Sequence, residues 1–155
     1  MTNNKQITIY VDADATPKPI KEIIFRAAKN RKIKAIFVAN QILNHPESDY
    51  IKSILVSKGF DVADNYIVEK VKENDLVISS DIPLADEVIT KGAIVITPYG
   101  RLYDQSNIKP ALAKRNFFTE MRDSGLMESK TRSFSQKESY QFSTKFDQYL
   151  AKFGF

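Results

Sequence analysis

The strongest constraint on the fold is a β-rich run that ends in two aspartates and passes directly into a helix start. The run covers residues 7–11, the acids are Asp12 and Asp14, and Thr16-Pro17 follows. We expect Thr16 to be the N-cap and Pro17 the first helical residue, because these types are favoured at those positions. Two carboxylates then lie where a strand ends and a helix begins, which is where ligands collect in an open parallel sheet.

The rest of the chain alternates strand and helix patterns up to Gly100 and is helical afterwards. Apolar runs predict strands at residues 33–39, 51–56, 75–79 and 93–96, and helical spacing predicts helices at 17–30, 60–72 and 84–91. A further helix is expected from residue 107 or 108 to Ser124. This order predicts an α/β fold, a three-layer α/β/α sandwich with a mostly parallel sheet and a helical C-terminal extension.

The last helix opens at a capping-box pattern in residues 135–138. Its aromatic and apolar residues give it too much apolar surface to leave in water, so we expect it to pack back on the domain. The residues available for that packing are Tyr140, Phe142, Phe146, Tyr149 and Leu150.

Length and composition exclude several classes of protein. The 155 residues predict a single domain, residues 1–155, with the C-terminal helices from about 107 packed on it. The chain has no cysteine, which excludes disulfides and thiolate metal sites. The polar start and the lack of a membrane-length apolar run indicate a cytoplasmic protein without membrane partners. The net charge of +4 is compatible with a polyanionic partner.

Aspartates recur at the predicted strand-to-helix corners. If the first and fourth predicted strands are neighbours, Asp12, Asp14 and Asp81 meet at one edge of the sheet, and Asp64 is placed to join them. Clustered carboxylates are costly unless a cation neutralises them, and Mg²⁺ or Mn²⁺ suits oxygen-only ligands. We therefore expect these four aspartates to bind the metal and to be catalytic. The simpler interpretation, in which each acid caps a helix or is solvated, remains open.

Four short motifs stand at these corners. They are residues 11–15 (Val-Asp-Ala-Asp-Ala), 38–41 (Val-Ala-Asn-Gln), 59–64 (Gly-Phe-Asp-Val-Ala-Asp) and 80–85 (Ser-Asp-Ile-Pro-Leu-Ala). Together they resemble the YaiI/YqxD family of bacterial proteins with a PIN-like domain. The resemblance extends through residues 102–103, 107–108 and 115–116 to 134–136, so it covers nearly the whole chain.

The resemblance implies a PIN-like, Rossmann-like sandwich whose acidic pocket is similar to that of metal-dependent ribonucleases. On that basis Asp12, Asp64 and Asp81 match the pocket acids of the family, and Asp14 is the second acid of the first motif. The expected activity is hydrolysis of phosphodiesters in RNA or single-stranded nucleic acid with Mg²⁺ or Mn²⁺. This chain has Thr-Pro-Tyr-Gly where the family commonly has Asn-Pro-Arg-Gly, so a phosphate-contacting role would pass to Arg101.

Substrate contacts are expected from polar residues near the same edge, namely Asn40, Ser80, Arg101 and Lys18. Tyr99 and Tyr103 are placed to stack on a base or, as the alternative, to cover the core. The first helix and the link after it carry many cations, which are either a solvated face or one side of the acidic pocket. These cations are Lys18, Lys21, Arg26, Lys29, Arg31, Lys32 and Lys34.

Two other functions use the same residues. Asp12-Ala-Asp14-Ala-Thr16 matches the Asp-x-Asp-x-Thr pattern of haloacid-dehalogenase-type phosphatases, in which Asp12 would be the nucleophile and Asp14 the general acid and base. Alternatively, the chain is a non-catalytic binding module with a vestigial acidic pocket. His45 is the single histidine and falls in a predicted loop, so a histidine-based triad has no support.

Overall fold

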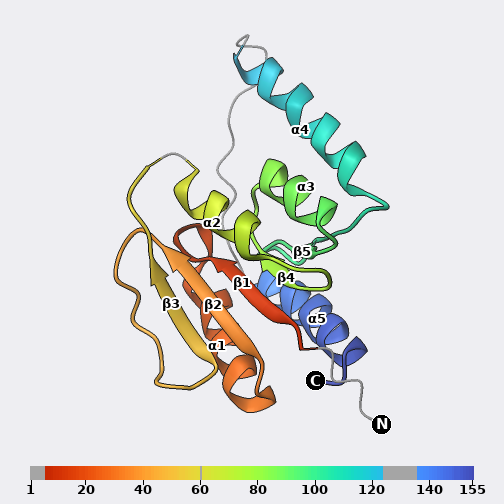
Figure 1. The fold of residues 1–155 in the computed structure, drawn as a ribbon. Coiled ribbons are helices and arrows are strands. Elements are labelled where there is room, and N and C mark those ends of the chain that lie inside the picture. Colours follow the sequence, from red (N-terminus) through yellow and green to blue (C-terminus); the bar gives the residue numbers. More distant parts are fainter. Residues whose placement is uncertain (1–5, 60, 124–135) are drawn as a thin grey trace.

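The centre of the molecule is a mostly parallel sheet (Figure 1). The computed structural model describes residues 6–59, 61–123 and 136–155, and in these ranges the sheet has six strands in the order β3-β2-β1-β4-β5-β6. The first five are parallel, and β6 runs antiparallel to β5. The strands are β1 (Thr8–Asp12), β2 (Lys34–Ala39), β3 (Ile51–Leu55), β4 (Leu76–Ile78), β5 (Ile94–Ile96) and β6 (Leu102–Tyr103).

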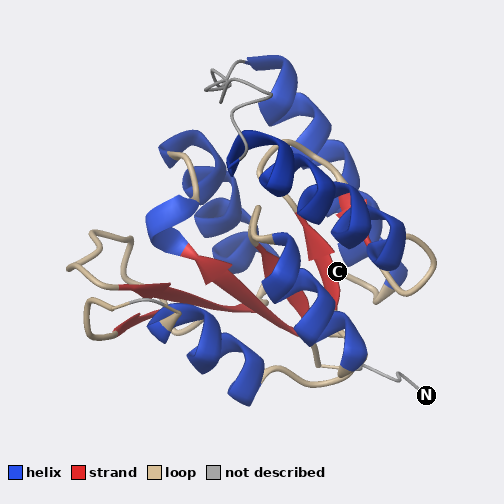
Figure 2. Cartoon of the chain, turned by 90° about the horizontal axis from the view of Figure 1, so that it is seen from above, coloured by secondary structure: helices blue, strands red, loops and turns tan. Residues whose placement is uncertain are grey.

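Helices cover both faces of the sheet (Figure 2). Helices α1 and α5 pack on one face, α2 and α3 pack on the other, and α4 lies against α3. None of the helices in the described ranges combines the length and apolar character that a membrane span requires. The helices are α1 (Lys18–Arg31), α2 (Val62–Lys70), α3 (Ile82–Thr90), α4 (Ile108–Asp123) and α5 (Gln136–Lys152), and a 3₁₀ turn η1 (Ala13–Ala15) follows β1.

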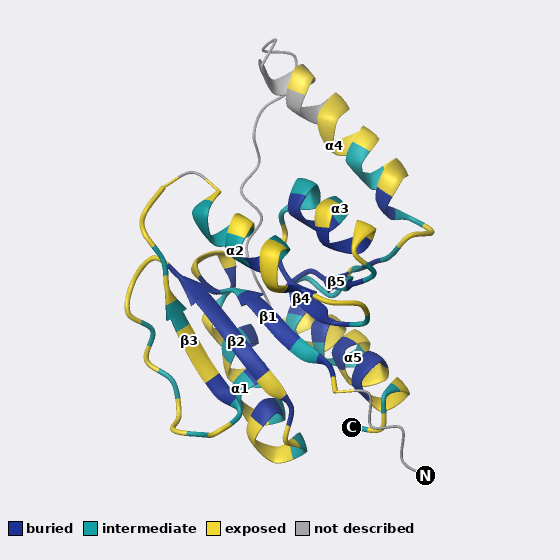
Figure 3. Cartoon of the chain, in the orientation of Figure 1, coloured by how far each residue is buried: buried dark blue, intermediate teal, exposed yellow. Residues whose placement is uncertain are grey.

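The central strands are buried on both faces because each face meets a helix layer (Figure 3). Successive side chains of a strand point to opposite faces. Val11 and Phe37 therefore pack towards α1 and α5, whereas Tyr10 and Val38 pack towards α2 and α3. The edge strand β3 is more exposed, with Leu55 65% accessible. This arrangement confirms the predicted three-layer α/β/α sandwich.

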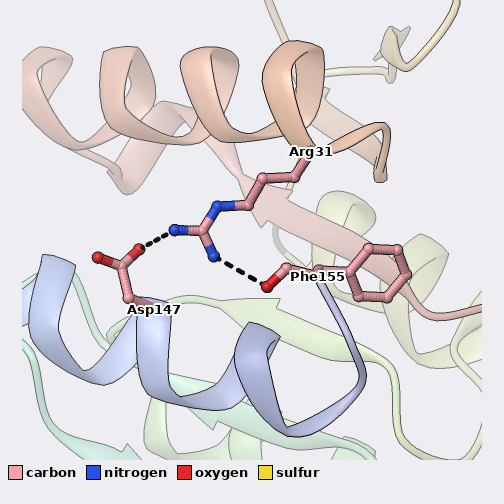
Figure 4. A network of polar contacts seen from close by, with 3 residues as sticks. All are labelled: Arg31, Asp147 and Phe155. Atoms are coloured by element: carbon pink, nitrogen blue, oxygen red, sulfur yellow. Dashed lines mark hydrogen bonds and ion pairs between the residues drawn. The ribbon is translucent and has the colours of Figure 1, made fainter.

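Helix α5 is part of the core although it is the last element of the chain. Four of its side chains lie in the hydrophobic cluster on the α1 side of the sheet, where α5 contacts α1 and β5, and Tyr149 also donates its hydroxyl to the Asn74 carbonyl at 2.7 Å. Arg31 at the end of α1 pairs with Asp147 at 2.9 Å and donates to the Phe155 carbonyl at 3.5 Å (Figure 4). The four buried side chains are Phe142, Phe146, Tyr149 and Leu150.

The expectation that Tyr140 packs with these residues is wrong. Its side chain is 74% exposed. Phe142 and Phe146 are four residues apart and therefore share one face of the helix, whereas Tyr140 lies two residues before Phe142 and about 200° away around the axis. Tyr140 is consequently on the outer side of α5.

The predicted start of α1 is also wrong. The helix begins at Lys18 with Pro17 as its N-cap and Pro19 in the first turn, and no side chain caps it. Thr16 is occupied elsewhere, because its hydroxyl donates to the carbonyl of Asp12 at 2.8 Å. The 3₁₀ turn after β1 brings these two residues together and delays the helix by one residue.

The sequence pattern did not indicate β6. Residues 97–100 form a turn that returns the chain to β5, with the Thr97 amide donating to the Arg101 carbonyl at 2.8 Å. A strand of two residues is too short to show alternation. Gly100 has a φ of +89°, and a Cβ there would lie 2.6 Å from the backbone of Gln141, so the turn rests directly on α5.

Candidate functional site

The site is built at the point where the order of the sheet reverses. β1 pairs with β2 on one side and with β4 on the other, and all three strands are parallel. In such sheets, ligands bind in the crevice outside the carboxyl ends of the strands at this point. Asp12 is the last residue of β1, and residues 79–81 follow β4 immediately. The neighbouring placement of β1 and β4, on which the expected acidic cluster depended, is therefore present.

Ser79 links the ends of the two strands. Its buried hydroxyl donates to Asp12 Oδ2 at 3.3 Å and accepts the backbone N–H of Asp81 at 3.1 Å. Burial raises the pKa of Asp12, and the negative charges of Asp81 and Asp14 raise it further, although the Ser79 hydrogen bond opposes the shift. The Asp12 carboxyl thus lies in a restricted environment where its charged form is disfavoured.

Asp81 and Asp64 form the second part of the cluster. Asp81 caps α3 by accepting the Leu84 amide at 3.0 Å. Asp64 is in the first turn of α2, and burial, a hydrogen bond to Asp81 and the charges of Asp81 and Asp12 raise the pKa of Asp64 to about 7. None of these three acids forms an ion pair with Lys or Arg in the described residues. The three carboxyls therefore repel one another when ionised, and this repulsion contributes to the raised pKa values of Asp12 and Asp64.

Asp14 is directed away from the other three acids. Its Oδ2 accepts the Asn40 amide at 2.7 Å and its Oδ1 accepts the Gln41 side chain at 3.4 Å, both just after β2. Its charge still contributes to the raised pKa of Asp12. Asp61 is exposed, has a φ of +62° and does not cap α2. The structure therefore brings Asp12, Asp64 and Asp81 together and holds Asp14 beside the end of β2.

The donor chemistry of these acids suits a hard divalent cation, because all the side-chain ligands offered are oxygens. Within residues 6–59, 61–123 and 136–155, however, no group of three or more His, Cys, Asp or Glu side chains has the arrangement of a metal site. Asp64 and Asp81 lie close enough for a proton on one carboxyl to bond to the other, which contributes to the raised pKa of Asp64.

The expected substrate-contacting residues lie around the same edge. Asn40 is exposed next to Asp14, and Lys18 is the exposed first residue of α1. Ser80 and Arg101 are exposed and line a pocket of about 890 Å³ beside the acids. Arg101 lies over the ring of Tyr103, 5.5 Å from its centroid. All four are therefore accessible from this side of the molecule.

The basic residues at the end of α1 and just after it are not beside the acids. Lys34 pairs with Thr8 at the start of β1, whereas Asp12 is at its end. Arg31, Lys32 and Lys34 line a separate pocket of about 600 Å³ at the amino ends of the strands. The interpretation that these residues form one side of the acidic pocket is therefore wrong, because a strand length of roughly 16 Å separates the two ends.

Sequence reasoning missed two groups of residues at this edge. The first is Ser79, which the pattern predicts only as the last residue of a strand. Its position at the carboxyl end of that strand is the one sequence signal that its hydroxyl could contact Asp12 and Asp81. The outer face of α5 forms one wall of the pocket, and nothing local to that helix indicates that it reaches the sheet edge. The pocket-lining residues of α5 are Tyr140, Gln141, Thr144 and Lys145.

The raised pKa of Asp64 has a consequence for stability. Because the folded-state pKa of about 7 exceeds the ordinary 3.8, the folded protein binds more protons between these values. This contribution is complete below about pH 4 and is lost as the pH rises through 7. Asp64→Asn, which does not ionise and keeps a donor for Asp81, should be more stable than wild type at pH 8 but not at pH 4. We expect the free energy of unfolding at pH 8 to rise by about 1 kcal/mol, which corresponds to a melting temperature higher by roughly 2–4 °C. This value is discounted because the carboxyl is half exposed, and solvent screens its interactions.

Thermal melts at several pH values measure this effect. Asp49→Asn is the matched control, since Asp49 is exposed before β3 and far from the cluster. A difference between Asp64→Asn and wild type that stays constant from pH 4 to pH 8 would contradict the assignment.

Comparison with known proteins places this site in a family. Residues 10–152 match the family model described as "Uncharacterized BCR, YaiI/YqxD family". The chain is 49% identical over 144 residues to the UPF0178 protein of Shewanella amazonensis and, over the same length, to that of Marinomonas sp.; each match covers 93% of this chain and 97% of the relative. The UPF0178 protein of Proteus mirabilis is 49% identical over 142 residues, which cover 92% of this chain and 94% of that relative. No solved structure matches. The chain therefore belongs to the YaiI/YqxD family.

Proposed function

We propose that this protein is a metal-dependent nuclease that hydrolyses phosphodiester bonds in RNA. The observation that carries the proposal is the convergence of Asp12, Asp64 and Asp81 at the switch point of the sheet without a cationic partner. Perturbed carboxyls gathered at a ligand-binding edge are typical of catalytic or metal sites. The resemblance to PIN-like ribonucleases supports the same reaction, as an analogy at the level of the fold.

The residues at this edge have three different roles in this proposal. Asp12, Asp64 and Asp81 would hold Mg²⁺ or Mn²⁺ once their side chains reorient, since no three acids of the described residues are arranged as a metal site in the structure itself. Asp14, which accepts the Asn40 amide, would add negative charge nearby without contacting the ion. When bound, such a cation lowers the pKa of a water molecule and neutralises charge on a phosphate. Ser79 fixes the Asp12 carboxylate and the Asp81 backbone at once, so it orients both acids.

RNA fits the surroundings of the acids better than a small phosphomonoester. The chain is basic overall, with a net charge of +4, so its surface favours a polyanion. None of the residues lining the pocket next to Asp81 is acidic, and two of them are Arg101 and Lys145. A long anionic substrate would therefore contact cations on one side while one phosphate meets the carboxylates.

The phosphatase alternative places a demand on Asp14 that its contacts do not favour. In that mechanism Asp14 would pass a proton to the leaving group, next to the nucleophile Asp12. Both Asp14 oxygens instead accept hydrogen bonds from Asn40 and Gln41. Covalent labelling of Asp12 by beryllofluoride would support the phosphatase and contradict the nuclease.

A cleavage assay with a labelled single-stranded RNA tests the proposal. We expect cleavage in Mn²⁺ or Mg²⁺, none in EDTA, and a rate at least ~100-fold lower for Asp12→Asn. Mn²⁺ should also raise the melting temperature of wild type more than that of Asp12→Asn, because a bound cation relieves the repulsion among the carboxylates and binds only the folded protein. Asp49→Asn should behave as wild type in both measurements. Binding of RNA without cleavage under all metal conditions would favour the non-catalytic module instead.

A further inference from the structure

We propose that the 890 Å³ pocket beside the acids is a subsite for one nucleotide of single-stranded RNA, with the base stacked on Tyr140 and the phosphate held by Arg101 and Lys145. The choice of RNA rests on the proposed function. The location of the pocket, its aromatic side chain and its two cations support the subsite independently of the proposed function.

The pocket shares a wall with the acidic cluster. Ser80 and Ile82 line it, and they are the residues on either side of Asp81. Ser80 also directly follows Ser79, whose hydroxyl contacts Asp12. A chain lying in this pocket would therefore continue past the Asp81 backbone to the carboxylates. Its volume lies within the ~300–1,000 Å³ typical of small-ligand sites.

The opposite wall is fixed by the docking of α5. The turn at residues 97–100 rests on α5 so closely that a Cβ at Gly100 would lie 2.7 Å from the amide of Phe142. Phe142 itself is buried in the core. The outer side of the same helical segment supplies Tyr140, Gln141 and Thr144 to the pocket. The wall is thus anchored before a ligand binds, which reduces the entropy cost of binding.

The cations of the pocket are presented without neutralising partners among its lining residues. Arg101 is held at the start of the β5–β6 hairpin by hydrogen bonds between its backbone and Thr97 at 2.8 and 3.1 Å. Its guanidinium group lies over Tyr103 and stays exposed. Lys145 is exposed one turn beyond Gln141. Arg101 and Lys145 would therefore hold the phosphate backbone of the RNA so that one phosphate lies at the acidic cluster.

The exposed aromatic ring gives the pocket its specificity for a base. Tyr140 is 74% exposed at the rim, and Tyr99 lines the pocket from the turn. Stacking on an aromatic side chain is tolerant of sequence, because every base has a π-face. Asn107 contributes shape rather than recognition, since its amide groups already bond to Leu102 and Asp104. We therefore expect binding of single strands with little preference among bases.

Binding of the full-length protein to fluorescein-labelled hexauridylate in EDTA tests this subsite without turnover. Tyr140→Ala should weaken binding about 5- to 100-fold, as expected for loss of one stacked base, and Tyr140→Phe should restore it. Arg101→Ala combined with Lys145→Ala should weaken binding and flatten the dependence of log K on log salt by about 1.4, because two phosphate contacts are lost. The matched control is Lys34→Ala with Lys52→Ala, which removes two cations from the opposite end of the sheet.

The outcomes separate this proposal from the nuclease proposal. Binding that is lost in Tyr140→Ala but accompanied by no cleavage in any metal supports the subsite and contradicts only the nuclease. Cleavage by wild type with binding unchanged in both pocket variants overturns the subsite and leaves the nuclease standing. Absence of hexauridylate binding by wild type at 50 mM salt also overturns the subsite, as does an equal loss of affinity in the control variant.

Discussion

Asp81→Asn is expected to reduce metal-dependent RNA cleavage at least ~100-fold while leaving RNA binding as tight as in wild type or tighter. The substitution removes one of the three acids that meet at the ends of β1 and β4. It also removes a negative charge next to the bound phosphate, so the electrostatic cost of binding falls. Parallel measurements of cleavage in Mn²⁺ and of binding in EDTA separate the two effects.

Asparagine is the informative replacement because of the second role of Asp81. Its Oδ1 caps α3 by accepting the Leu84 amide, and an asparagine oxygen accepts that bond equally well. The folded structure should therefore be retained, and a thermal melt close to wild type checks this. Asp81→Ala would remove the cap as well, at a cost of about 1 kcal/mol. Cleavage that survives Asp81→Asn, or that ignores EDTA, would assign the activity to other residues or to a contaminant.

The layers of the fold were predictable because each strand and helix leaves its own local pattern of apolar residues in the sequence. Buried parallel strands appear as continuous apolar runs, such as residues 33–39, and amphipathic helices appear as stripes. Their order along the chain then restricts the topology. The errors fall where a tertiary contact decides the local structure. The Thr16 hydroxyl bonds to the Asp12 carbonyl instead of capping α1, and the turn that leads into β6 lies against α5, which is distant in sequence.

The acidic site was predictable in outline and not in detail. Aspartates at strand-to-helix corners must approach one another once β1 and β4 are neighbours, so Asp12 and Asp81 follow from topology. The direction in which each carboxylate points does not follow from topology. Asp14 bonds to the amide of Asn40 because β2 ends beside it, and this depends on the register between β1 and β2. The approach of Asp64 to Asp81 depends similarly on how α2 lies against α3.

The pocket illustrates what a single sequence does not contain. Its walls come from the segment after β4, the hairpin of β5 and β6, and α5, which are separated by tens of residues. Hydrophobic periodicity separates the buried face of α5 from its outer face, and it places Tyr140 on the outer face. It does not indicate that this outer face lies beside the hairpin of β5 and β6 and forms a pocket with it.

Phe146→Ala is expected to destabilise the protein by about 3–5 kcal/mol, the usual cost of emptying a buried phenylalanine site. Phe146 is fully buried and stacks on Phe142, with ring centroids 5.1 Å apart, in the hydrophobic cluster that α1, α5 and the sheet share. Chemical denaturation should show a lower midpoint, and a thermal melt should fall by roughly 10 °C. Tyr140→Ala is the control on the same helix, and its exposed side chain should cost less than about 0.5 kcal/mol. Similar losses for both variants, or a loss below 1 kcal/mol for Phe146→Ala, would show that α5 is not part of the cooperative core.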